Sequence, residues 1–436
     1  MGLNDRPASE RVHIGFFGLR NAGKSSVVNR VTGQELSLVS DNKGTTTDPV
    51  KKTMELLPIG PVVIIDTPGI DDEGELGKMR VERAKDVLGE TDIAVLVVDA
   101  TSSLKEKDNE LIASFKEKSI PYIIAYNKSD LIDETDKEVI RNSQLNDESF
   151  KDSKKNRQPL NEAFKNGERC KNGTDELANE IFVSALTDKG IYELKELIGK
   201  VSKATLNKDK KILEGLVEEG DMVVLVVPID SAAPKGRLIL PQQQVIRDVL
   251  ESGATAIVCR DTEFADTLKK LGQSPKLVIT DSQAFASVSK DTPKNIPLTS
   301  FSILFSRYKG DLQTQIDGVK MLDKLKDGDT ILMAEGCTHH RQCDDIGTVK
   351  LPRWISEYTG KKLNFATSSG GGFPENLSPY RLIVHCGGCT LSKREMAFRI
   401  AEAKDQNVPI VNYGTMIAQL KGVLKRSIAP FADELS

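Results

Sequence analysis

The sequence lacks long apolar runs, has a single tryptophan and four histidines, and carries no excess of basic residues. Its longest apolar runs, such as Ile93 to Val98, are far shorter than the roughly 20 residues of a membrane helix. The formal net charge of −4 is not the basic excess that draws proteins to nucleic acid, and no basic, aromatic-interleaved patch is present. We therefore expect neither a membrane nor a nucleic acid among its partners.

The N-terminal segment shows no targeting signal. Met1 to Arg11 is polar and lacks the apolar core of a signal peptide, and Arg6 stands where a myristoylation signal requires Ser or Thr. We expect a cytoplasmic protein, in which cysteines are poor disulfide candidates. Four of the six cysteines and three of the four histidines lie between Cys337 and Cys389, which indicates a metal site or catalysis.

The 436 residues are enough for two to three domains, and 39% of them are hydrophobic, which is ample for ordinary cores. The first part alternates strands and helices, the pattern of a mainly parallel sheet. We predict a helix over Ser26 to Val31. The predicted strands are Val12–Phe17, Val62–Asp66, Ile93–Asp99, Tyr122–Tyr126 and Glu180–Val183.

A phosphate-binding loop follows the first strand. Gly18 to Ser25 reads G-x-x-x-x-G-K-S between a strand and a helix. Glycines let backbone N–H groups turn toward phosphate oxygens, Lys24 reaches the terminal phosphates, and Ser25 can ligate Mg²⁺. The residues assigned to nucleotide binding here are Gly18, Asn21, Ala22, Gly23, Lys24, Ser25 and Ser26.

Two further motifs follow later strands of this domain. Asp66-Thr-Pro-Gly69 provides a carboxylate that can hold Mg²⁺ through water and a glycine amide that can meet a γ-phosphate. Asn127-Lys128-Ser-Asp130 provides a carboxylate that can accept both N–H donors of a guanine edge, which adenine does not offer.

The fifth strand leads to Ser184-Ala185, where a backbone amide can meet the guanine O6. Each short motif alone also fits a polar loop. Four of them in this order at strand ends predict a GTPase.

These motifs resemble those of the GTPases TrmE and Era over about Val12 to Val201. The resemblance implies that Thr46 binds Mg²⁺ and takes part in catalysis with Lys24. Ile70 stands where Ras-like proteins carry the water-positioning glutamine. The resemblance also implies that Asn21 ligates K⁺ in place of an arginine finger, so we expect K⁺-stimulated GTP hydrolysis. The acidic residues Asp71, Asp72, Glu73 and Glu75 include either a water-orienting carboxylate or only a solvated acidic loop.

An insertion and a linker complete the first domain. Between Asp130 and Ser184 lie 53 residues, and the polar stretch 132–179 is expected to be a mobile insertion or a pair of exposed helices. We interpret its Cys170 as an incidental thiol. Lys203 to Lys211 is basic and polar, and we predict a linker there.

A middle unit without chemical motifs follows, and we expect a structural or oligomerising role for it. Its Cys259 is expected to be a small buried side chain on a strand. Strands are predicted over Met222–Val227, Ala254–Cys259, Lys276–Thr280 and Ser300–Phe305, and a helix over Gln242–Glu251.

The third unit carries the cysteines and histidines. The predicted strand Thr330–Ala334 leads into a C-x-H motif, and Arg381–Val384 leads into H-C-x-x-C. The candidate ligands are Cys337, His339, His340, Cys343, His385, Cys386 and Cys389. Thiolate-rich sites with compact turns suit Zn²⁺ or iron–sulfur clusters. A metal-free redox C-x-x-C is an alternative, although such motifs do not require a partner C-x-H.

A TrmE-like GTPase domain, a unit without motifs and this cysteine and histidine pattern together resemble the HydF family of FeFe-hydrogenase maturation GTPases. The resemblance covers the full chain in domain order. It implies that Cys337, Cys386 and Cys389 hold a four-iron, four-sulfur cluster whose labile fourth position is filled by His339 or His385. It further implies a scaffold that receives a two-iron precursor from the radical-SAM maturases HydE and HydG and delivers it to apo FeFe-hydrogenase.

We therefore predict an α/β protein with an N-terminal P-loop GTPase domain on a mainly parallel sheet, followed by two further α/β domains. The predicted bounds are 1–205 for the GTPase domain, 212–325 for a dimerisation domain and 326–436 for an iron–sulfur cluster domain. The expected cofactors are GTP, Mg²⁺, K⁺ and the four-iron, four-sulfur cluster, with the two-iron precursor as cargo. The resemblance also implies a homodimer.

Several alternatives stay open. His340 and Cys343 are extra potential ligands, with Cys343 interpreted as a bystander. The alternative function is an RNA- or ribosome-associated GTPase with a structural zinc site. A third hypothesis is a GTPase whose metal site is purely structural. Oxygen donors near the cysteines, or simple surface charges, are Glu335, Asp344 and Asp345.

Overall fold

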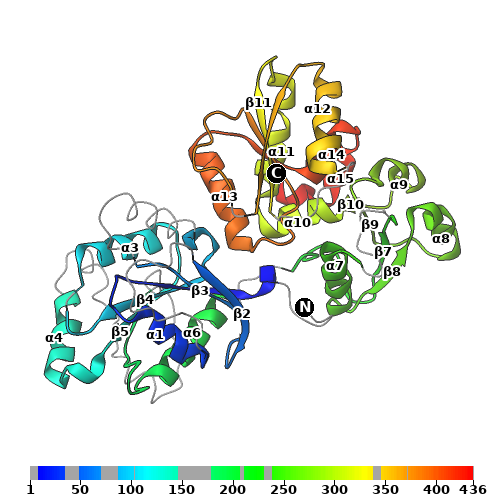
Figure 1. The fold of residues 1–436 in the computed structure, drawn as a ribbon. Helices are drawn as coiled ribbons and strands as arrows, with labels where there is room; N and C mark the ends of the chain where they lie inside the picture. The colour runs from blue at the N-terminus through cyan, green and yellow to red at the C-terminus, as the bar shows by residue number, and fades with distance from the viewer. Residues whose placement is uncertain are drawn as a thin grey trace. The chain divides into compact units, whose positions relative to one another are not determined.

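The computed structural model describes residues 8–34, 49–69, 87–102, 104–145, 178–206, 211–229, 238–336, 345–370 and 372–435. The chain forms two compact units, Met1–Asp209 and Lys210–Ser436, each drawn in Figure 1. The two predicted C-terminal domains, residues 212–325 and 326–436, thus lie in one compact unit.

The first unit is built on a six-stranded sheet in the order β2-β3-β1-β4-β5-β6. Its strands are β1 (Val12–Phe17), β2 (Val50–Leu56), β3 (Gly60–Asp66), β4 (Ile93–Asp99), β5 (Tyr122–Asn127) and β6 (Ala178–Phe182). Only β2 runs antiparallel to its neighbour, so the predicted mainly parallel sheet is confirmed. All five predicted strands are present. The prediction missed β2 because most of its side chains are exposed and it has no apolar run.

Helices cover both faces of this sheet. Helices α1 (Lys24–Thr32) and α6 (Ile191–Leu206) pack on one face, and α3 (Glu106–Glu117) packs on the other. The prediction of a linker from Lys203 is wrong in its first residues, because α6 continues to Leu206 and buries Ser202. Short 3₁₀ turns lie at η1 (Ala8–Glu10) and η2 (Ser129–Leu131).

The predicted insertion begins with one helix, α4 (Glu134–Leu145). Most of the remaining insertion, residues 146–177 with Cys170, lies outside the described residues. The choice between a mobile insertion and paired helices therefore stays open.

The second unit contains two four-stranded parallel sheets, in the orders β10-β9-β7-β8 and β12-β11-β13-β14. The first has β7 (Met222–Val226), β8 (Thr255–Cys259), β9 (Leu277–Thr280) and β10 (Leu298–Ser300), with α7 (Leu240–Glu251), η4 (Asp261–Glu263), α8 (Phe264–Lys270), α9 (Phe285–Asp291) and α10 (Phe301–Lys309). The next segment has α11 (Leu312–Val319), η5 (Leu322–Lys324), β11 (Thr330–Glu335), the π-helical turn η6 (Ile346–Lys350), α12 (Leu351–Thr359) and β12 (Asn364–Ser369). The chain ends with β13 (Leu382–His385), α13 (Lys393–Asp405), β14 (Ile410–Asn412), α14 (Tyr413–Leu420), α15 (Leu424–Ile428) and η7 (Ala429–Glu434).

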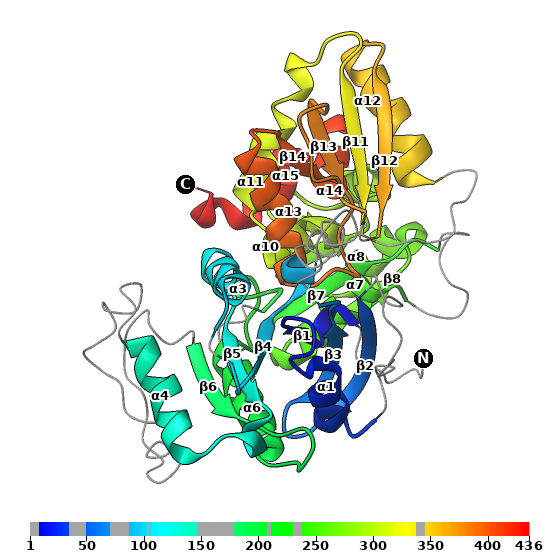
Figure 2. The ribbon, with the colours of Figure 1, turned by 60° about the vertical axis from the view of Figure 1, so that its left-hand side comes forward.

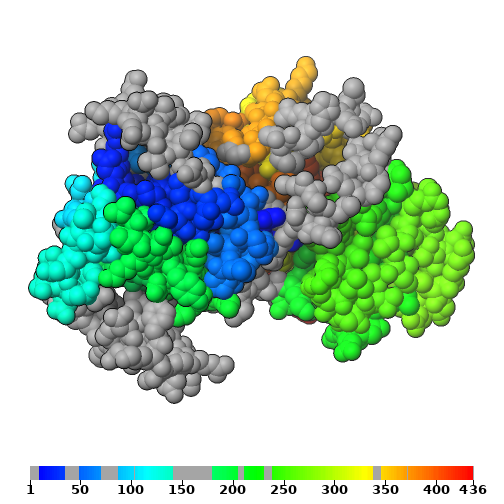
Figure 3. Space-filling view, turned by 60° about the horizontal axis from the view of Figure 1, so that its bottom comes forward, coloured from blue at the N-terminus to red at the C-terminus, as the bar shows by residue number. Residues whose placement is uncertain are grey.

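Two predictions for this unit are wrong. The segment Ser300–Phe305 is not a strand: Ser300 ends β10 and caps helix α10, its hydroxyl accepting a hydrogen bond from the Ile303 amide. Its apolar run is buried as a helix, which periodicity cannot distinguish from a short buried strand. The predicted strand Ala254–Cys259 is present as β8, but it is a half-exposed edge strand: Cys259, which was expected to be buried, is only partly buried, and Val258 is 45% exposed. In the space-filling view, the green residues of this part of the chain form one continuous surface (Figure 3).

The two sheets of this unit repeat one topology. In each, the third strand in sequence lies beside the first, and the second strand forms an edge. The sequence repeats as well: Asn-Ile-Pro-Leu at 295–298 corresponds to Asn-Val-Pro-Ile at 407–410, and Lys309-Gly corresponds to Lys421-Gly. Both helices that follow, α10 and α14, begin with a side-chain cap, Ser300 in one and Asn412 in the other. The second unit therefore contains an internal repeat, with one sheet and its helices in each half.

The third sheet is covered on both faces. Helices α12 and α14 pack with Ile331 and Val384 on one face, and α13 packs with Leu332 and Ile383 on the other. Figure 2 shows β11 and β12 side by side with α12 beside them. The C-terminal segment contributes Phe431 to the core of the preceding sheet. None of the helices in the described parts of the chain is both long and apolar enough to cross a membrane.

Candidate functional site

The phosphate-binding loop and the Asp66 motif meet at one edge of the first sheet. They follow β1 and β3, which are parallel neighbours paired from Val12 with Val62 to Phe16 with Asp66. Thr67 joins them: its amide and hydroxyl donate to the Phe16 carbonyl at 3.2 and 2.7 Å. Strand order reverses between β1 and its other neighbour β4, and the carboxyl ends of strands at such a reversal form the usual ligand crevice of such folds.

The structure brings three predicted phosphate and Mg²⁺ residues into contact. The Lys24 ammonium donates to Asp66 Oδ1 at 2.9 Å, and the Ser25 hydroxyl donates to Asp66 Oδ2 at 3.2 Å. Lys24 and Asp66 are both at least nine-tenths buried. A carboxylate beside a serine hydroxyl provides hard oxygen ligands of the kind Mg²⁺ prefers.

Backbone geometry explains the glycines of the loop. Gly23 has φ +80°, and a Cβ built on it would lie 2.2 Å from the Asn127 amide nitrogen. Gly18 has φ +150°, and its Cβ would lie 2.4 Å from the Val97 carbonyl oxygen. Asn21 is exposed and also left-handed, with φ 63°. The loop is a tight turn in which side chains at two positions would collide with neighbouring strands.

Asn127 ties the phosphate loop to the base-binding loop. Its buried side chain donates to the Ala22 carbonyl and accepts from the Ala185 amide, both at 3.0 Å. The neighbouring Lys128 donates to Asp99 Oδ2 at 2.5 Å. Partial burial opposes ionisation of Asp99, but hydrogen bonds from Lys128 and Thr101 outweigh it and lower the pKa of that carboxyl.

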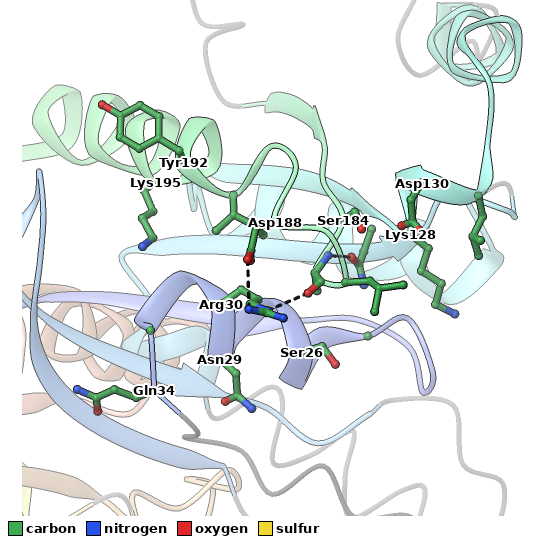
Figure 4. Close-up of a pocket in the computed structure, with 17 residues that line it drawn as sticks. Ser26, Asn29, Arg30, Gln34, Lys128, Asp130, Ser184, Asp188, Tyr192 and Lys195 are labelled. Carbon is green, nitrogen blue, oxygen red and sulfur yellow. Dashed lines mark hydrogen bonds and ion pairs between the residues drawn. The ribbon is translucent and has the colours of Figure 1, made fainter.

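The guanine end of the site is an open groove. Asp130 is exposed at its wall, while Ser184 is fully buried and holds the turn through its hydroxyl, which accepts from the Thr187 amide at 3.2 Å. Arg30 on α1 donates to the Ala185 carbonyl at 2.9 Å and pairs with Asp188 at 3.2 Å (Figure 4). The groove has a volume of about 1020 Å³, sufficient for a nucleotide.

The geometry thus brings together most of the predicted nucleotide residues. Gly69 also lies beside the loop, since a Cβ there would be 3.2 Å from the Arg20 backbone. Thr46, Ile70 and the acidic residues 71–75 lie outside the described residues, so their predicted roles stay untested. Sequence reasoning missed Asp99 and Arg30, which hold the base loop. The position of Asp99 at the end of the predicted strand Ile93–Asp99, at the same sheet edge as the motifs, could have indicated its role.

The C-x-x-C motif occupies the equivalent edge of the third sheet. It follows β13, whose parallel neighbour β11 ends at Glu335, directly before Gly336 and Cys337. The Gly336 amide donates to Cys386 Sγ at 3.1 Å, and the Gly388 amide donates to the same sulfur at 3.4 Å. Gly336, the residue before Cys337 in the sequence, therefore meets the C-x-x-C loop at the point where strand order reverses.

The described thiols suit an iron–sulfur cluster or zinc. Neither Cys386 nor Cys389 is in a disulfide, and backbone N–H donors directed at a sulfur stabilise a thiolate ligand. Burial raises the pKa of the Cys389 thiol, and the nearby charge of Lys309 opposes that rise. Within the described ranges, no three His, Cys, Asp or Glu side chains are placed to hold a metal. Cys337, His339, His340 and Cys343 lie outside those ranges.

His385 presents neither ring nitrogen to the cysteines. It is fully buried, its Nδ1 lies 2.8 Å from the Cys386 carbonyl, and its Nε2 lies 3.1 Å from Arg399 Nη1. Because arginine only donates, Nε2 accepts and Nδ1 carries the proton. Burial and the Arg399 charge lower the pKa of His385 to about 3, so the ring is neutral at pH 7. This geometry disagrees with the prediction of His385 as fourth ligand, since both nitrogens are occupied.

Two predicted oxygen donors have other surroundings than expected. Glu335 is buried rather than a surface charge, at the end of β11. Asp345 caps η6, accepting from the Thr348 amide and hydroxyl at 2.8 and 2.9 Å. Asp344 lies outside the described residues.

Three family models match the chain. Residues 313–430 match the hydrogen maturase F tetramerization domain, residues 212–310 match the hydrogen maturase F dimerization domain, and residues 13–128 match the 50S ribosome-binding GTPase. The match to the GTPase model spans the phosphate loop and the start of the guanine-binding motif.

Curated relatives are similar to this chain over about a third of its length. GTPase Der of Kosmotoga olearia is 35% identical over 139 residues, which cover 31% of this chain and 31% of Der. The tRNA modification GTPase MnmE of Dechloromonas aromatica is 36% identical over 121 residues, covering 28% of this chain and 27% of MnmE. The chain thus spans less than a third of the length of the curated relatives it matches.

Solved structures resemble the chain weakly. Era of Aquifex aeolicus, bound to GDP and aluminium fluoride, has a TM-score of 0.34 and 20% identity, covering 57% of this chain and 91% of Era. A bacterial selenocysteine-specific elongation factor has a TM-score of 0.35 and 20% identity, covering 46% of this chain and 30% of the factor.

Proposed function

Because this chain belongs to the hydrogen maturase F family, we propose that it is a GTP-hydrolysing scaffold that carries a two-iron precursor to apo FeFe-hydrogenase during maturation. The observation that carries the proposal is the C-x-x-C loop at the end of β13, in contact with Gly336 and within the part matched by the tetramerization model. Its N–H···S contacts suit thiolate ligands of an iron–sulfur cluster.

In this function Cys337, Cys386 and Cys389 hold a four-iron, four-sulfur cluster. With three protein thiolates, one iron has an exchangeable ligand, which gives a carrier an open position for its cargo. His339 is the remaining candidate for that ligand, since both ring nitrogens of His385 are hydrogen-bonded, one to the Cys386 carbonyl and one to Arg399. The maturases HydE and HydG are the proposed donors of the two-iron unit.

The first test is the metal content of anaerobically purified or reconstituted full-length protein. A brown protein with iron and sulfide supports the scaffold. A colourless protein with one zinc per chain favours the alternative, an RNA- or ribosome-associated GTPase with a structural zinc site, which the similarity to the tRNA modification GTPase MnmE supports.

Cysteine variants separate a functional cluster from a structural metal. Replacing Cys337, Cys386 or Cys389 by Ala should abolish hydrogenase activation in a coupled maturation assay, while the first unit still hydrolyses GTP. Loss of cooperative unfolding in these variants would instead make the metal structural. Activation assays with non-hydrolysed GTP analogues on cluster-loaded protein then decide whether hydrolysis or binding alone drives transfer.

GTP hydrolysis itself is proposed to depend on K⁺. The side chain of Asn21 is exposed on a left-handed turn of the phosphate loop, where it can reach a cation beside the phosphates. A K⁺ ion there would offset charge on the phosphates in the transition state, with Lys24 and Thr46 as the other proposed catalytic groups. Equal hydrolysis rates in Na⁺ and K⁺ buffers would contradict this step.

A second copy of this chain is the proposed partner at the edge of the middle sheet. Among the described strands β8 pairs only with β7, and it exposes Val258; Leu250 of α7 is also exposed, at 59%. Unpaired edges of this kind readily add a strand from another chain. Val258→Lys should convert the dimer to a monomer in analytical ultracentrifugation, whereas the same change at exposed Val139 of α4 should not.

A further inference from the structure

Lys309 is a buried lysine directed at the C-x-x-C loop. It is the last residue of α10, in the part matched by the dimerization model, and is 5% exposed. Its Nζ lies 3.0 Å from the Gly388 carbonyl oxygen, 3.1 Å from that of Cys389 and 2.8 Å from that of Leu391. All three acceptors belong to the loop that carries the two described cysteine ligands.

The number of acceptors indicates the charged form of this lysine. An ammonium has three N–H donors, and three carbonyls lie within hydrogen-bond distance of Nζ. Lysine is rarely so buried without a specific partner, because an ammonium loses its hydration when it leaves water. The carbonyl oxygens of the loop therefore bind the positive charge of Lys309 directly.

The internal repeat provides a comparison at the same position. Lys421 is the counterpart of Lys309, at the end of helix α14, and both precede a glycine. Lys421 is exposed and lies over the Trp354 ring at 4.5 Å instead of reaching a strand-end loop. A lysine that merely completes the end of this helix type can thus remain at the surface.

We propose that Lys309 is a positioning residue for the cluster: its ammonium holds residues 386–391 in the ligating conformation and places a fixed positive charge beside the cluster. The proposal rests on the proposed function. A cluster with three thiolate ligands is anionic, and net charge, burial and hydrogen bonding set the reduction potential of such clusters. A nearby cation favours the reduced form, which carries one more negative charge.

The loop fits this role because two of its residues are glycines, whose backbone conformation has to be fixed by contacts. Gly388 is left-handed with φ +59°, and Gly387 has only the Ser302 hydroxyl near the position of a Cβ, at 3.7 Å. Two consecutive glycines carry high conformational entropy, so three hydrogen bonds from one buried group have a large share in fixing the turn. Thr390 adds a hydrogen bond to the Gly336 carbonyl at 3.1 Å, which closes the loop onto β11.

The test uses full-length Lys309→Gln and Lys309→Met, with Lys421→Gln as the matched control. Each protein is reconstituted anaerobically with iron and sulfide. Iron content per chain and the midpoint potential of the cluster are measured, the latter by redox titration followed by electron paramagnetic resonance. Hydrogen exchange of amides 386–391 is measured before iron is added, and thermal unfolding is recorded for all variants.

The expected result is a folded Lys309→Gln protein in which these amides exchange about tenfold faster or more. It should either hold its cluster at a lower potential or lose most of its iron, while Lys421→Gln matches the wild type. Wild-type iron content, potential and exchange in Lys309→Gln would overturn the proposal, and so would equal changes in Lys421→Gln. Failure of both Lys309 variants to fold would also overturn it, because the lysine would then belong to the fold. Wild-type protein that takes up no iron–sulfur cluster would refute the proposed function, whereas the exchange result would still report on the loop.

Discussion

Removing the side chain of Asn127 should weaken GTP binding strongly, because this side chain joins the phosphate loop to the base loop. Its two hydrogen bonds, each 3.0 Å long, join the carbonyl of Ala22 in the phosphate loop to the amide of Ala185 in the base loop. All three residues are more than nine-tenths buried. The Asn127→Ala change leaves one backbone acceptor and one backbone donor without their partner.

The magnitude follows from these two groups. An unpaired buried polar group costs about 1–3 kcal/mol, so the pair costs about 2–6 kcal/mol. Asn127 lines the open groove, so water can reach the vacated space when the nucleotide is absent, and bound nucleotide excludes that water. Most of the cost therefore falls on binding. Taking about 2–4 kcal/mol, we expect GTP affinity to fall about 30- to 700-fold, because about 1.4 kcal/mol corresponds to tenfold.

The assay is a fluorescence titration with methylanthraniloyl-GTP in Mg²⁺ buffer. Asn109→Ala on the exposed face of α3 is the control and should bind as the wild type does. Thermal unfolding must show that Asn127→Ala is folded at the assay temperature. An affinity within about threefold of the wild type would contradict this prediction, since it would mean that these two hydrogen bonds contribute under about 1 kcal/mol.

Other substitutions test separate parts of the structure. Gly23→Ala should abolish measurable GTP binding, because its Cβ would lie 2.2 Å from a buried amide nitrogen, whereas Gly33→Ala, at φ +65° in open space, should cost only about 1 kcal/mol of unfolding free energy. Gly336→Ala should lower the iron content after reconstitution, because its Cβ would lie 2.6 Å from a buried leucine side chain beside the cysteine loop; wild-type iron content would contradict this. Asp311 is partly buried, but hydrogen bonds from Lys404 and a threonine outweigh that burial and lower its pKa to about 2. Because the Asp311–Lys404 ion pair is exposed, it contributes about 0.5–1 kcal/mol to the free energy of unfolding. This contribution is present above about pH 4 and is lost as pH falls toward 2. The unfolding free energies of Asp311→Asn and of the wild type, measured in urea, should therefore converge at low pH.

The sequence predictions were correct where the pattern that carried them lies within a short stretch of chain. The phosphate loop and the Asn127 motif depend on short spacings next to strong apolar strands, and the structure brings Lys24, Ser25 and Asp66 together as expected. The strand predicted over Ser300–Phe305 failed because its apolar run carries no period, so only the capping geometry of Ser300 distinguishes the helix.

At the cysteine site, the local spacing was informative but the contacts made by distant residues were not predictable. Spacing alone indicated a metal site, but nothing local indicated that the two nitrogens of His385 are used by Arg399 and the Cys386 carbonyl. Arg399 lies 14 residues further on, and a helix was needed to bring it back to the strand end. The buried state of Glu335 likewise depends on packing that composition does not reveal.

The guanine-nucleotide motifs, the parallel α/β class and the paired cysteine segments can be recognised without coordinates, because each depends on residues that are close along the chain. The groups that contact those motifs from distant parts of the chain become visible in the folded protein alone. Asn127 reaches back 105 residues to Ala22, and Lys309 reaches forward 79 residues to Gly388. Such contacts depend on the order of strands in the sheet and on which helix end meets which loop, and neither property is encoded in any single stretch of sequence.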